Sequence, residues 1–405
     1  MHGGRRAALA AAVVVLAGCA APDSDATQAE GQSWDQVLAE ADGQTVSLWM
    51  YGGDEAGNAY VDDVLTPAAA DLGVTLRRVP VAETTEALDR VLDERQAGVA
   101  DGEVDLVWVN GANFGTGKQA GAWLCGWADD LPNARYLAPD DPLLAEDFGT
   151  PVDACESPWH KAQFTLVYDS AAVPDPPTDL AGVLDWARAN PGRFTYPAPP
   201  DFTGSVFVRQ VLTNVAADDV PLDYSADAFD EVTPPLWDVL RELRPSLWRE
   251  GRDQPTSQQE LDRLYADGEV AMTMTYGPAT LTDLVADGTF PPTTRVLTLD
   301  DGTFGNASFL ALPASSGSQA GAQVVADLAL SPAQQVAKAD PPTWGQFTVL
   351  DLDLLPAADR EAFDRLPASP VVPPFEELSA NARPELSAAW VPPLDDGWRR
   401  EVLGS

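Results

Sequence analysis

The feature that most constrains the fold is an alternation of strand and helix patterns in the first third of the chain. Apolar runs typical of buried strands occupy 45–51, 74–79 and 104–109, and helical patterns occupy the intervening 58–72 and 84–98. Strands joined by helices pair in parallel through right-handed crossovers. Ligands of such sheets bind beyond the carboxyl ends of the strands. We therefore expect an α/β fold with a binding crevice at that edge, and we expect Pro67 to bend or divide the first helix.

The N-terminus has the pattern of a bacterial lipoprotein signal peptide. Arg5 and Arg6 precede an apolar run that ends in Leu16-Ala17-Gly18-Cys19. This run is too short to span a membrane, and a small residue before the cysteine is typical of a cleavage site. We expect residues 1–18 to be removed, Cys19 to carry the lipid and residues 19–33 to form a flexible tether outside the cytoplasmic membrane. The alternative is an ordinary signal peptide with a chance cysteine.

Length and charge limit the class of protein. About 370 residues follow the tether, which is more than one core normally holds and suits two lobes of about 150 residues each. No other apolar run approaches the length of a membrane span, so the mature chain is expected to be soluble. The net charge of −39, from 63 acidic and 24 basic residues, excludes nucleic-acid binding, which requires clustered Lys and Arg. The acidic residues are spread along the chain, as on a solvated surface.

The residues needed for catalysis are scarce. His160 is the only histidine after the signal peptide, and neither a metal-ligand spacing, a Gly-x-Ser-x-Gly elbow nor a P-loop occurs. A metal-dependent enzyme or a Ser-His-Asp hydrolase is therefore not expected, and neither is a cofactor. Carboxylate pairs such as Glu156 with Asp201 leave one competing hypothesis, a secreted lipoprotein hydrolase that cleaves glycans.

Two further cysteines, Cys125 and Cys155, follow Cys19. An extracytoplasmic location permits them to form a disulfide, which would stabilise the fold by about 3 to 4 kcal/mol in the chain-entropy model. The alternative is a pair of buried thiols.

Polar and aromatic residues follow the first and third strands of the alternating segment. Tyr51-Gly52-Gly53 and Asn58 come after the first strand, and Asn110 and Asn113 come after the third. Glycines let a backbone approach a ligand, asparagine both donates and accepts hydrogen bonds, and an aromatic face can stack on a ring or hold a cation. Both loops are expected to face the same crevice. The alternative is that these are ordinary turn residues.

A second set of elements follows. A strand is expected at 162–169, a helix at 180–190 and a further strand at 270–276. Between them Asp201 caps a helix whose first turn contains Thr203-Gly204-Ser205. The unpaired amides of such a turn can bind an anionic or hydroxyl group. A capped helix start without a ligand is the alternative.

At this point the chain resembles a known family, the ABC-transporter extracellular solute-binding proteins, and within it the YnjB-type branch near the thiamine, spermidine and ferric-ion binders. The resemblance covers nearly all of residues 43–350. The motifs that carry it are Tyr51-Gly52-Gly53-Asp54, Val104-Asp105-Leu106-Val107-Trp108-Val109-Asn110-Gly111, the run from Asn190 to Phe202, and Lys338-Ala339-Asp340-Pro341.

The resemblance implies a two-lobe α/β fold like that of the type II periplasmic binding proteins. Each lobe would contain a sheet whose core strands are parallel, a hinge would link the two lobes, and the ligand cleft would lie between them. We expect lobe 1 at 34–160 with 277–315 returning to it, lobe 2 at 161–276, and C-terminal helices with an extended tail at 316–405. The chain would cross the hinge near Trp159–Gln163 and near Tyr276. The implied function is binding without turnover, by a monomer that closes on its solute and delivers it to an ABC permease. A sensor subunit is a third hypothesis.

The resemblance also implies a ligand site between the lobes. Residues expected to contact the solute are Tyr51, Gly52, Gly53, Asn58, Asn110 and Asn113 from lobe 1, Tyr196, Thr203, Gly204 and Ser205 from lobe 2, Trp159 and Tyr276 near the hinge, and Trp344. Trp108 is expected in the core. Aromatic residues and the acidic surface favour a cationic or heteroaromatic solute, such as thiamine or a polyamine, whereas the helix start at Ser205 favours a phosphate or carboxylate. The sequence leaves that choice open.

Overall fold

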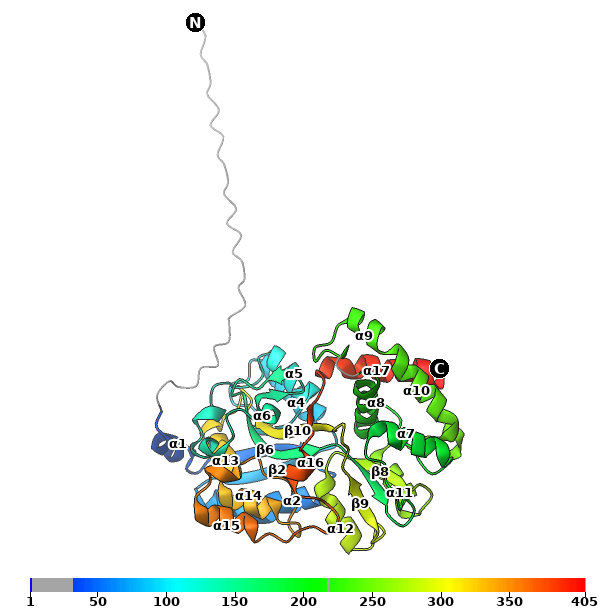
Figure 1. The fold of residues 1–405 in the computed structure, drawn as a ribbon. Helices are drawn as coiled ribbons and strands as arrows, with labels where there is room; N and C mark the ends of the chain where they lie inside the picture. Colours follow the sequence, from blue (N-terminus) through cyan, green and yellow to red (C-terminus); the bar gives the residue numbers. More distant parts are fainter. Residues whose placement is uncertain (2–31, 217–218, 405) are drawn as a thin grey trace.

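The computed structural model describes Met1 and residues 32–216 and 219–404, which form two lobes side by side (Figure 1). The expected signal peptide, Cys19 and nearly all of the expected tether lie outside the described residues. Within the described ranges, no helix is both long and apolar enough to cross a membrane.

Lobe 1 is built on a mixed sheet. Its strands are β1 (Thr45–Tyr51), β2 (Thr75–Val81), β3 (Leu106–Val109), β6 (Glu156–Gln163), β10 (Phe304–Ala311) and β11 (Arg383–Pro384). The order is β11-β10-β3-β1-β2, and β6 also pairs with β10. β1 runs parallel to β2 and β3, as the alternation of strands and helices predicts, whereas β10 runs antiparallel to β3 and β6. The carboxyl ends of β1 and β3 therefore lie at one edge of the sheet.

Helices cover this sheet on both faces (Figure 1). They include α1 (Trp34–Ala41), α2 (Glu55–Tyr60), α3 (Thr66–Asp71), α4 (Thr84–Gln96), α5 (Ala112–Gln119), α6 (Pro142–Ala145), α13 (Gln319–Leu330), α14 (Pro332–Ala339) and α15 (Ala357–Asp364). The first crossover helix begins earlier than expected, because the Asp54 side chain caps it by accepting from the Gly57 amide at 2.9 Å. It is divided by a π-helical turn, Val61–Leu65, immediately before the turn that contains Pro67.

Lobe 2 has a three-stranded antiparallel sheet in the order β8-β7-β9. The strands are β7 (Thr165–Asp169), β8 (Met272–Thr275) and β9 (Thr294–Leu297), and the helices are α7 (Leu180–Ala189), α8 (Phe202–Val215), α9 (Ala226–Val232), α10 (Pro234–Leu243), α11 (Gln258–Ala266) and α12 (Leu281–Ala286). The parallel pairing of the fold thus lies in lobe 1.

Both expected hinge crossings need adjustment. The strand expected at 162–169 is two strands, because Gln163 ends β6 in lobe 1 and Thr165 begins β7 in lobe 2. The chain does not return to lobe 1 at Tyr276. Instead β9 pairs with β7, with Val296 opposite Val167, so the return lies between β9 and β10.

The C-terminal segment crosses the molecule once more and does not end as the extended tail that we expected. After α16 (Phe375–Leu378), β11 joins the edge of the lobe 1 sheet beside β10. The chain then forms α17 (Val391–Trp398), drawn in red beside α8 and α10 in Figure 1. Trp390, Leu394 and Trp398 are buried in the same apolar core as the inner face of α8, so lobe 2 is completed by the last residues of the chain.

A disulfide joins Cys125 to Cys155 and closes the segment before β6. It packs beside Trp123 in the part of the lobe 1 core that lies under α4 and α5.

Candidate functional site

The loop after β1 is held by its own side chains. The Asn58 amide donates to the Gly52 carbonyl at 2.8 Å, and its oxygen accepts from Arg78 at 3.1 Å. Asn58 therefore supports the loop, with one amide hydrogen and one oxygen lone pair already in use. Tyr51 is 37% exposed, and its hydroxyl lies where a side chain at Gly53 would stand. Glycine at this position is what allows the tyrosine to fold over the loop.

The loop after β3 presents a backbone amide. Gly111 has φ of 62° and ψ of −132°, a conformation that favours glycine. Its N–H donates to both carboxylate oxygens of Asp147, at 2.8 and 2.7 Å. Asn113 accepts from the Thr85 hydroxyl at 3.2 Å, and Asn110 is half-buried. The residue that this loop positions is thus Asp147, which the sequence analysis did not place in the site.

The start of α8 is not the open set of amides that we expected. The Asp201 carboxylate accepts from the Gly204 amide at 2.9 Å. Gly204 packs so tightly on the Pro197 carbonyl that no Cβ would fit. The Ser205 hydroxyl donates to Asp395 at 2.5 Å. The Asp201 carboxylate therefore already accepts from an amide of this turn, and the Asp395 carboxylate accepts from its Ser205 hydroxyl. Two negative charges at the turn make it a poor site for an anion.

Tyr196 and Thr203 are buried rather than lining a wall. The Tyr196 hydroxyl accepts from the Trp398 indole at 3.0 Å, and its ring packs 4.6 Å from that of Phe207. The exposed aromatic residue on this side is instead Phe202, the first residue of α8. It is 48% exposed and its ring centre lies 5.5 Å from that of Tyr276.

Four residues from distant segments meet where the lobes join, and we call them the junction cluster: Asp147, Arg209, Tyr276 and Glu385. Arg209 of α8 donates through Nε and Nη2 to the two oxygens of Glu385, both at 3.1 Å. The Tyr276 hydroxyl donates to the same carboxylate at 3.2 Å. The Arg209 guanidinium also stands 5.9 Å from the ring of Phe148, the residue after Asp147. The cluster thus joins lobe 1, lobe 2 and the C-terminal segment.

The cluster carries more negative than positive groups. Burial raises the pKa of Asp147 to about 7, with the Glu385 charge as a further cause, although the Gly111 amide opposes the rise. Glu156 is 1% exposed, and neither of its oxygens has a hydrogen-bond partner. Burial and then the Asp147 charge raise the pKa of Glu156 well above its ordinary value. The Lys118 charge partly opposes the rise in the pKa of Glu156. Among the described residues, however, neither Asp147 nor Glu156 forms an ion pair, and Glu385 already engages Arg209, so a cation placed beside the two carboxyl groups would be favoured.

An aromatic cluster lies beside the loop after β1. A bulge in the β6–β10 pairing falls between Ser308 and Phe309 of β10, opposite the segment of β6 that contains Trp159 and His160. The ring of Trp344 lies 5.1 Å from each of them, and 5.5 Å from that of Tyr60. The Trp344 indole donates to Asp54 at 2.8 Å. Trp159 and Trp344 are buried in the lobe 1 core. Trp108 is half-buried and packs against the same core, with its ring 5.4 Å from that of Trp159, in agreement with its expected core role.

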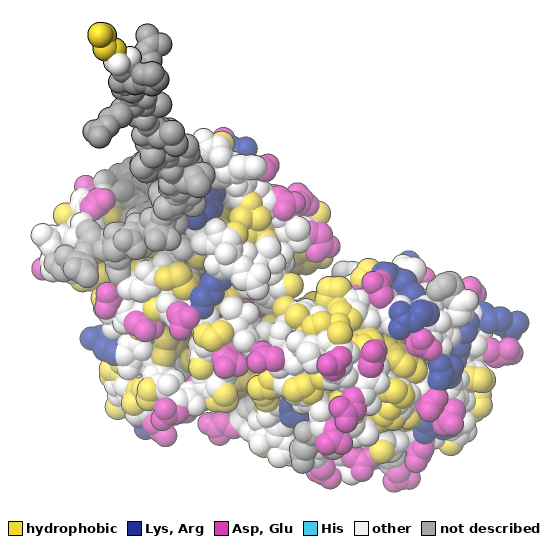
Figure 2. Space-filling view, turned by 90° about the horizontal axis from the view of Figure 1, so that it is seen from above, with side chains coloured by type: hydrophobic (Ala, Val, Ile, Leu, Met, Phe, Trp, Pro, Cys, Tyr) yellow, Lys and Arg dark blue, Asp and Glu magenta, His cyan; other side chains and the backbone are white. Residues whose placement is uncertain are grey.

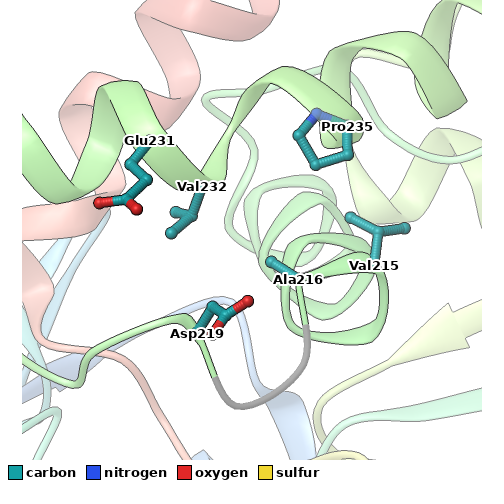
Figure 3. A pocket seen from close by; sticks show the side chains of 6 residues that line it. All are labelled: Val215, Ala216, Asp219, Glu231, Val232 and Pro235. Carbon is teal, nitrogen blue, oxygen red and sulfur yellow. The ribbon is translucent and has the colours of Figure 1, made fainter.

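The surface is hollowed where the two lobes meet, with acidic side chains on both sides (Figure 2). A separate open hollow of about 470 Å³ lies at the far end of α8, and its lining contains no residue of the expected site (Figure 3). It is lined by Val215, Ala216, Asp219, Glu231, Val232 and Pro235. In the part of the chain that the structure describes, no three His, Cys, Asp or Glu side chains are grouped to hold a metal ion.

Comparison with known proteins places this geometry in context. A family model described as bacterial extracellular solute-binding protein matches residues 63–351. Protein YnjB of Escherichia coli (strain K12) is 39% identical over 369 residues, which are 90% of this chain and 92% of YnjB.

Solved structures share the fold at low sequence identity. An ABC transporter protein from Clostridium perfringens has a TM-score of 0.62 at 14% identity, over 89% of this chain and 99% of that one. The spermidine/putrescine substrate-binding protein PotD from Streptococcus pneumoniae has 0.61 at 12%, over 89% and 99%. A periplasmic thiamin binding protein has 0.57 at 16%, over 88% and 96%.

Proposed function

Because this chain belongs to the family of bacterial extracellular solute-binding proteins, we propose that it captures a small cationic solute between its two lobes. It is the substrate-binding component of an ABC-type importer, it is not an enzyme, and it works outside the cytoplasm. Nothing in the comparisons favours the glycan hydrolase. The class of solute, the residues that bind it and the lipid anchor at Cys19 are proposals.

The observation that carries the proposal is the pair of buried carboxylates Asp147 and Glu156. Among the residues that the structure describes, neither has a cationic partner within hydrogen-bonding distance, and burial raises the pKa of both. Asp147 is only 1% exposed, so in this proposal a solute reaches it when the lobes move apart. A solute ammonium placed against Asp147 would then replace the missing counter-charge and favour the ionised carboxylate. The two lobes bring Asp147 and Tyr276 to the same carboxylate neighbour, Glu385, so a solute held there would contact both lobes.

The helix start of α8 argues against the anionic alternative that the sequence leaves open. Its Gly204 amide is used by Asp201, and its Ser205 hydroxyl by Asp395. A phosphate or carboxylate would have to displace one carboxylate and approach the other. The structure therefore favours the cationic reading of the sequence.

Two exposed rings supply the remaining contacts in this proposal. Tyr51 follows β1 in lobe 1, and Phe202 begins α8 in lobe 2. Aromatic faces attract cations and stack on heterocycles. Closure of the lobes would bring these walls onto the solute, and the solute can shift the equilibrium only by binding the closed form more tightly. A lipid at Cys19 would keep the loaded protein near its permease and raise the effective concentration of the pair.

Thermal unfolding of the protein with a panel of small solutes tests the proposal. Spermidine, putrescine and thiamine represent cations, and inorganic phosphate and glutamate represent anions. Saturation to 100 times the dissociation constant adds about 2.7 kcal/mol of stability. We expect a saturable shift with one of the cations, and the ligand recovered unchanged. A shift with the anions alone would overturn the cationic assignment, and conversion of a solute to product would overturn the assignment as a receptor.

Two variants and a pH series locate the site. Asp147→Asn should abolish the shift, whereas Asp129→Asn, the same change at an exposed position of lobe 1, should retain it. Below pH 7 the cation must displace the Asp147 proton, so affinity should fall about tenfold per pH unit. Equal affinities at pH 5 and pH 8 would exclude Asp147 as the cation acceptor.

A further inference from the structure

The segment 383–390, which we call the C-terminal strap, contacts both lobes. At its start Arg383 lies opposite Phe304 at the edge of the lobe 1 sheet. Farther along, the Ala388 amide donates to the Phe148 carbonyl of lobe 1 at 3.2 Å, and the Ser387 amide donates to the Leu222 carbonyl of lobe 2 at 3.0 Å. Glu385 lies between these contacts, so the strap fixes its carboxylate at the place where the lobes meet.

Glu385 of the strap forms an ion pair with Arg209, the one cation of the junction cluster. The side chains of Arg209 and Glu385 are each only 1% exposed. Arg209 uses two nitrogens on Glu385, and its charge is also felt by Asp395 and Tyr276. Without Glu385, a buried guanidinium with free donors would stand 5.9 Å from the ring of Phe148, the residue after Asp147. Arginine binds carboxylates readily in such geometry, so it would compete with any solute cation for Asp147.

We propose that Glu385 sets the charge selectivity of the interlobe site by neutralising Arg209, which leaves Asp147 free to receive a solute cation. This inference rests on the proposed function for its meaning, but the electrostatic role of Glu385 does not depend on which solute is bound. In this role Glu385 acts on the solute only indirectly, by neutralising Arg209. It comes from a segment more than a hundred residues away from Tyr276 in the sequence.

The groups that face this carboxylate come from four parts of the fold. They are Arg209 on α8, Tyr276 after β8, Asp147 at the end of the short strand β4 (Glu146–Asp147) and, around the same guanidinium, Asp395 on α17. Glu385→Gln keeps the shape of the side chain and removes one negative charge from this group. Arg209→Met with Glu385→Gln removes one charge of each sign and leaves the net charge as it is in the native protein.

The first measurement needs no ligand. Carboxyl ¹³C NMR of the full chain gives the pKa of Asp147, which burial and Glu385 hold at about 7. In Glu385→Gln it should fall by about one unit or more, because a like charge is lost and an opposite one is uncovered. In the double variant it should return to near the native value. An unchanged pKa in Glu385→Gln would overturn the proposal.

The second measurement is affinity for spermidine and thiamine. Glu385→Gln should lose about tenfold in affinity, the equivalent of one pKa unit, and the double variant should recover it. A double variant that folds but binds as weakly as Glu385→Gln would mean that the strap acts by holding the lobes together, which would overturn the proposal. If Glu385→Gln does not fold, the double variant alone decides. Native affinity in the double variant would support the proposal, because it would mean that the net charge of the Arg209–Glu385 pair, and not the ion pair itself, determines cation binding.

The two proposals can fail separately. If the native protein binds neither cation, the proposed function fails, and the pKa of Asp147 in the variants still decides the role of Glu385. If the native protein binds a cation and the variants leave both the pKa of Asp147 and the affinity unchanged, the role of Glu385 fails alone.

Discussion

Replacing Asp147 by asparagine should stabilise the ligand-free protein at neutral and alkaline pH. Asparagine retains an oxygen to accept from the Gly111 amide, which is the hydrogen bond that the native carboxylate makes. It lacks the charge that burial opposes. The substitution therefore isolates the cost of keeping an ionised carboxylate at the junction of the lobes when no solute is bound.

The magnitude follows from the pKa of Asp147, which burial raises from 3.8 to about 7. Below pH 3.8 both folded and unfolded chains hold the proton, so the carboxyl group costs nothing. As the pH rises towards 7, the unfolded chain releases its proton while the folded chain keeps it, so stability falls. Above pH 7 the full difference, about 4 kcal/mol, is lost. The advantage of Asp147→Asn should therefore grow by about 2 to 3 kcal/mol between pH 5 and pH 8.

Urea unfolding of the ligand-free protein at pH 5 and pH 8 measures this difference. The native chain, Asp147→Asn and the exposed control Asp129→Asn should be compared at both values. The control should follow the native protein at each pH. An advantage of Asp147→Asn that is the same at pH 5 and pH 8, or a variant less stable than the native protein at pH 8, would refute the reasoning.

Two further substitutions test the packing that supports the site. Changing both Cys125 and Cys155 to serine opens a disulfide of sequence separation 30 and should cost about 3.5 kcal/mol in urea unfolding; a loss under 1 kcal/mol would contradict the chain-entropy account. Gly57→Ala should cost about 1 to 3 kcal/mol, because its Cβ would lie 2.8 Å from the Trp344 ring. Thermal unfolding measures this loss, with the exposed Ala59→Ser as control, and equal stabilities would show that Trp344 can move aside.

The order of elements in lobe 1 could be predicted because each strand and helix carries its own pattern. The three apolar runs and the helices between them form the parallel part of the sheet, and the loops after β1 and β3 lie at one edge as expected. The insertion of β10 beside β3 was not predictable in this way. Its partner strands lie far away in the sequence, and no local pattern specifies such a pairing.

The junction cluster escaped the sequence analysis for the same reason. Arg209 and Glu385 are 176 residues apart, and each alone is an ordinary charged residue. One signal was available, since Arg209 lies within the apolar stretch of α8, between Val208 and Val211. An arginine on a buried helix face requires a partner. That reasoning would have indicated a buried carboxylate, although not which of the many in this acidic chain.

Tyr196 and Asn58 show the opposite limit. Both are residue types that bind ligands, and both were expected to contact the solute. Their polar groups are instead used by neighbours, Trp398 for the tyrosine hydroxyl and Arg78 with the Gly52 carbonyl for the amide. Residue type indicates what a side chain can bind, whereas only tertiary packing decides whether that capacity is still free.

The C-terminal strap also sets the order in which the molecule can be completed. While a nascent or exported chain still lacks residue 385, Arg209 has no carboxylate to bury against, and burying it alone would cost several kcal/mol. Helix α8 also lacks the apolar cover that Leu394 and Trp398 provide. Lobe 2 therefore cannot reach its final packing without its last segment, and a chain truncated before residue 385 would lack the carboxylate that keeps Arg209 paired at the junction of the lobes.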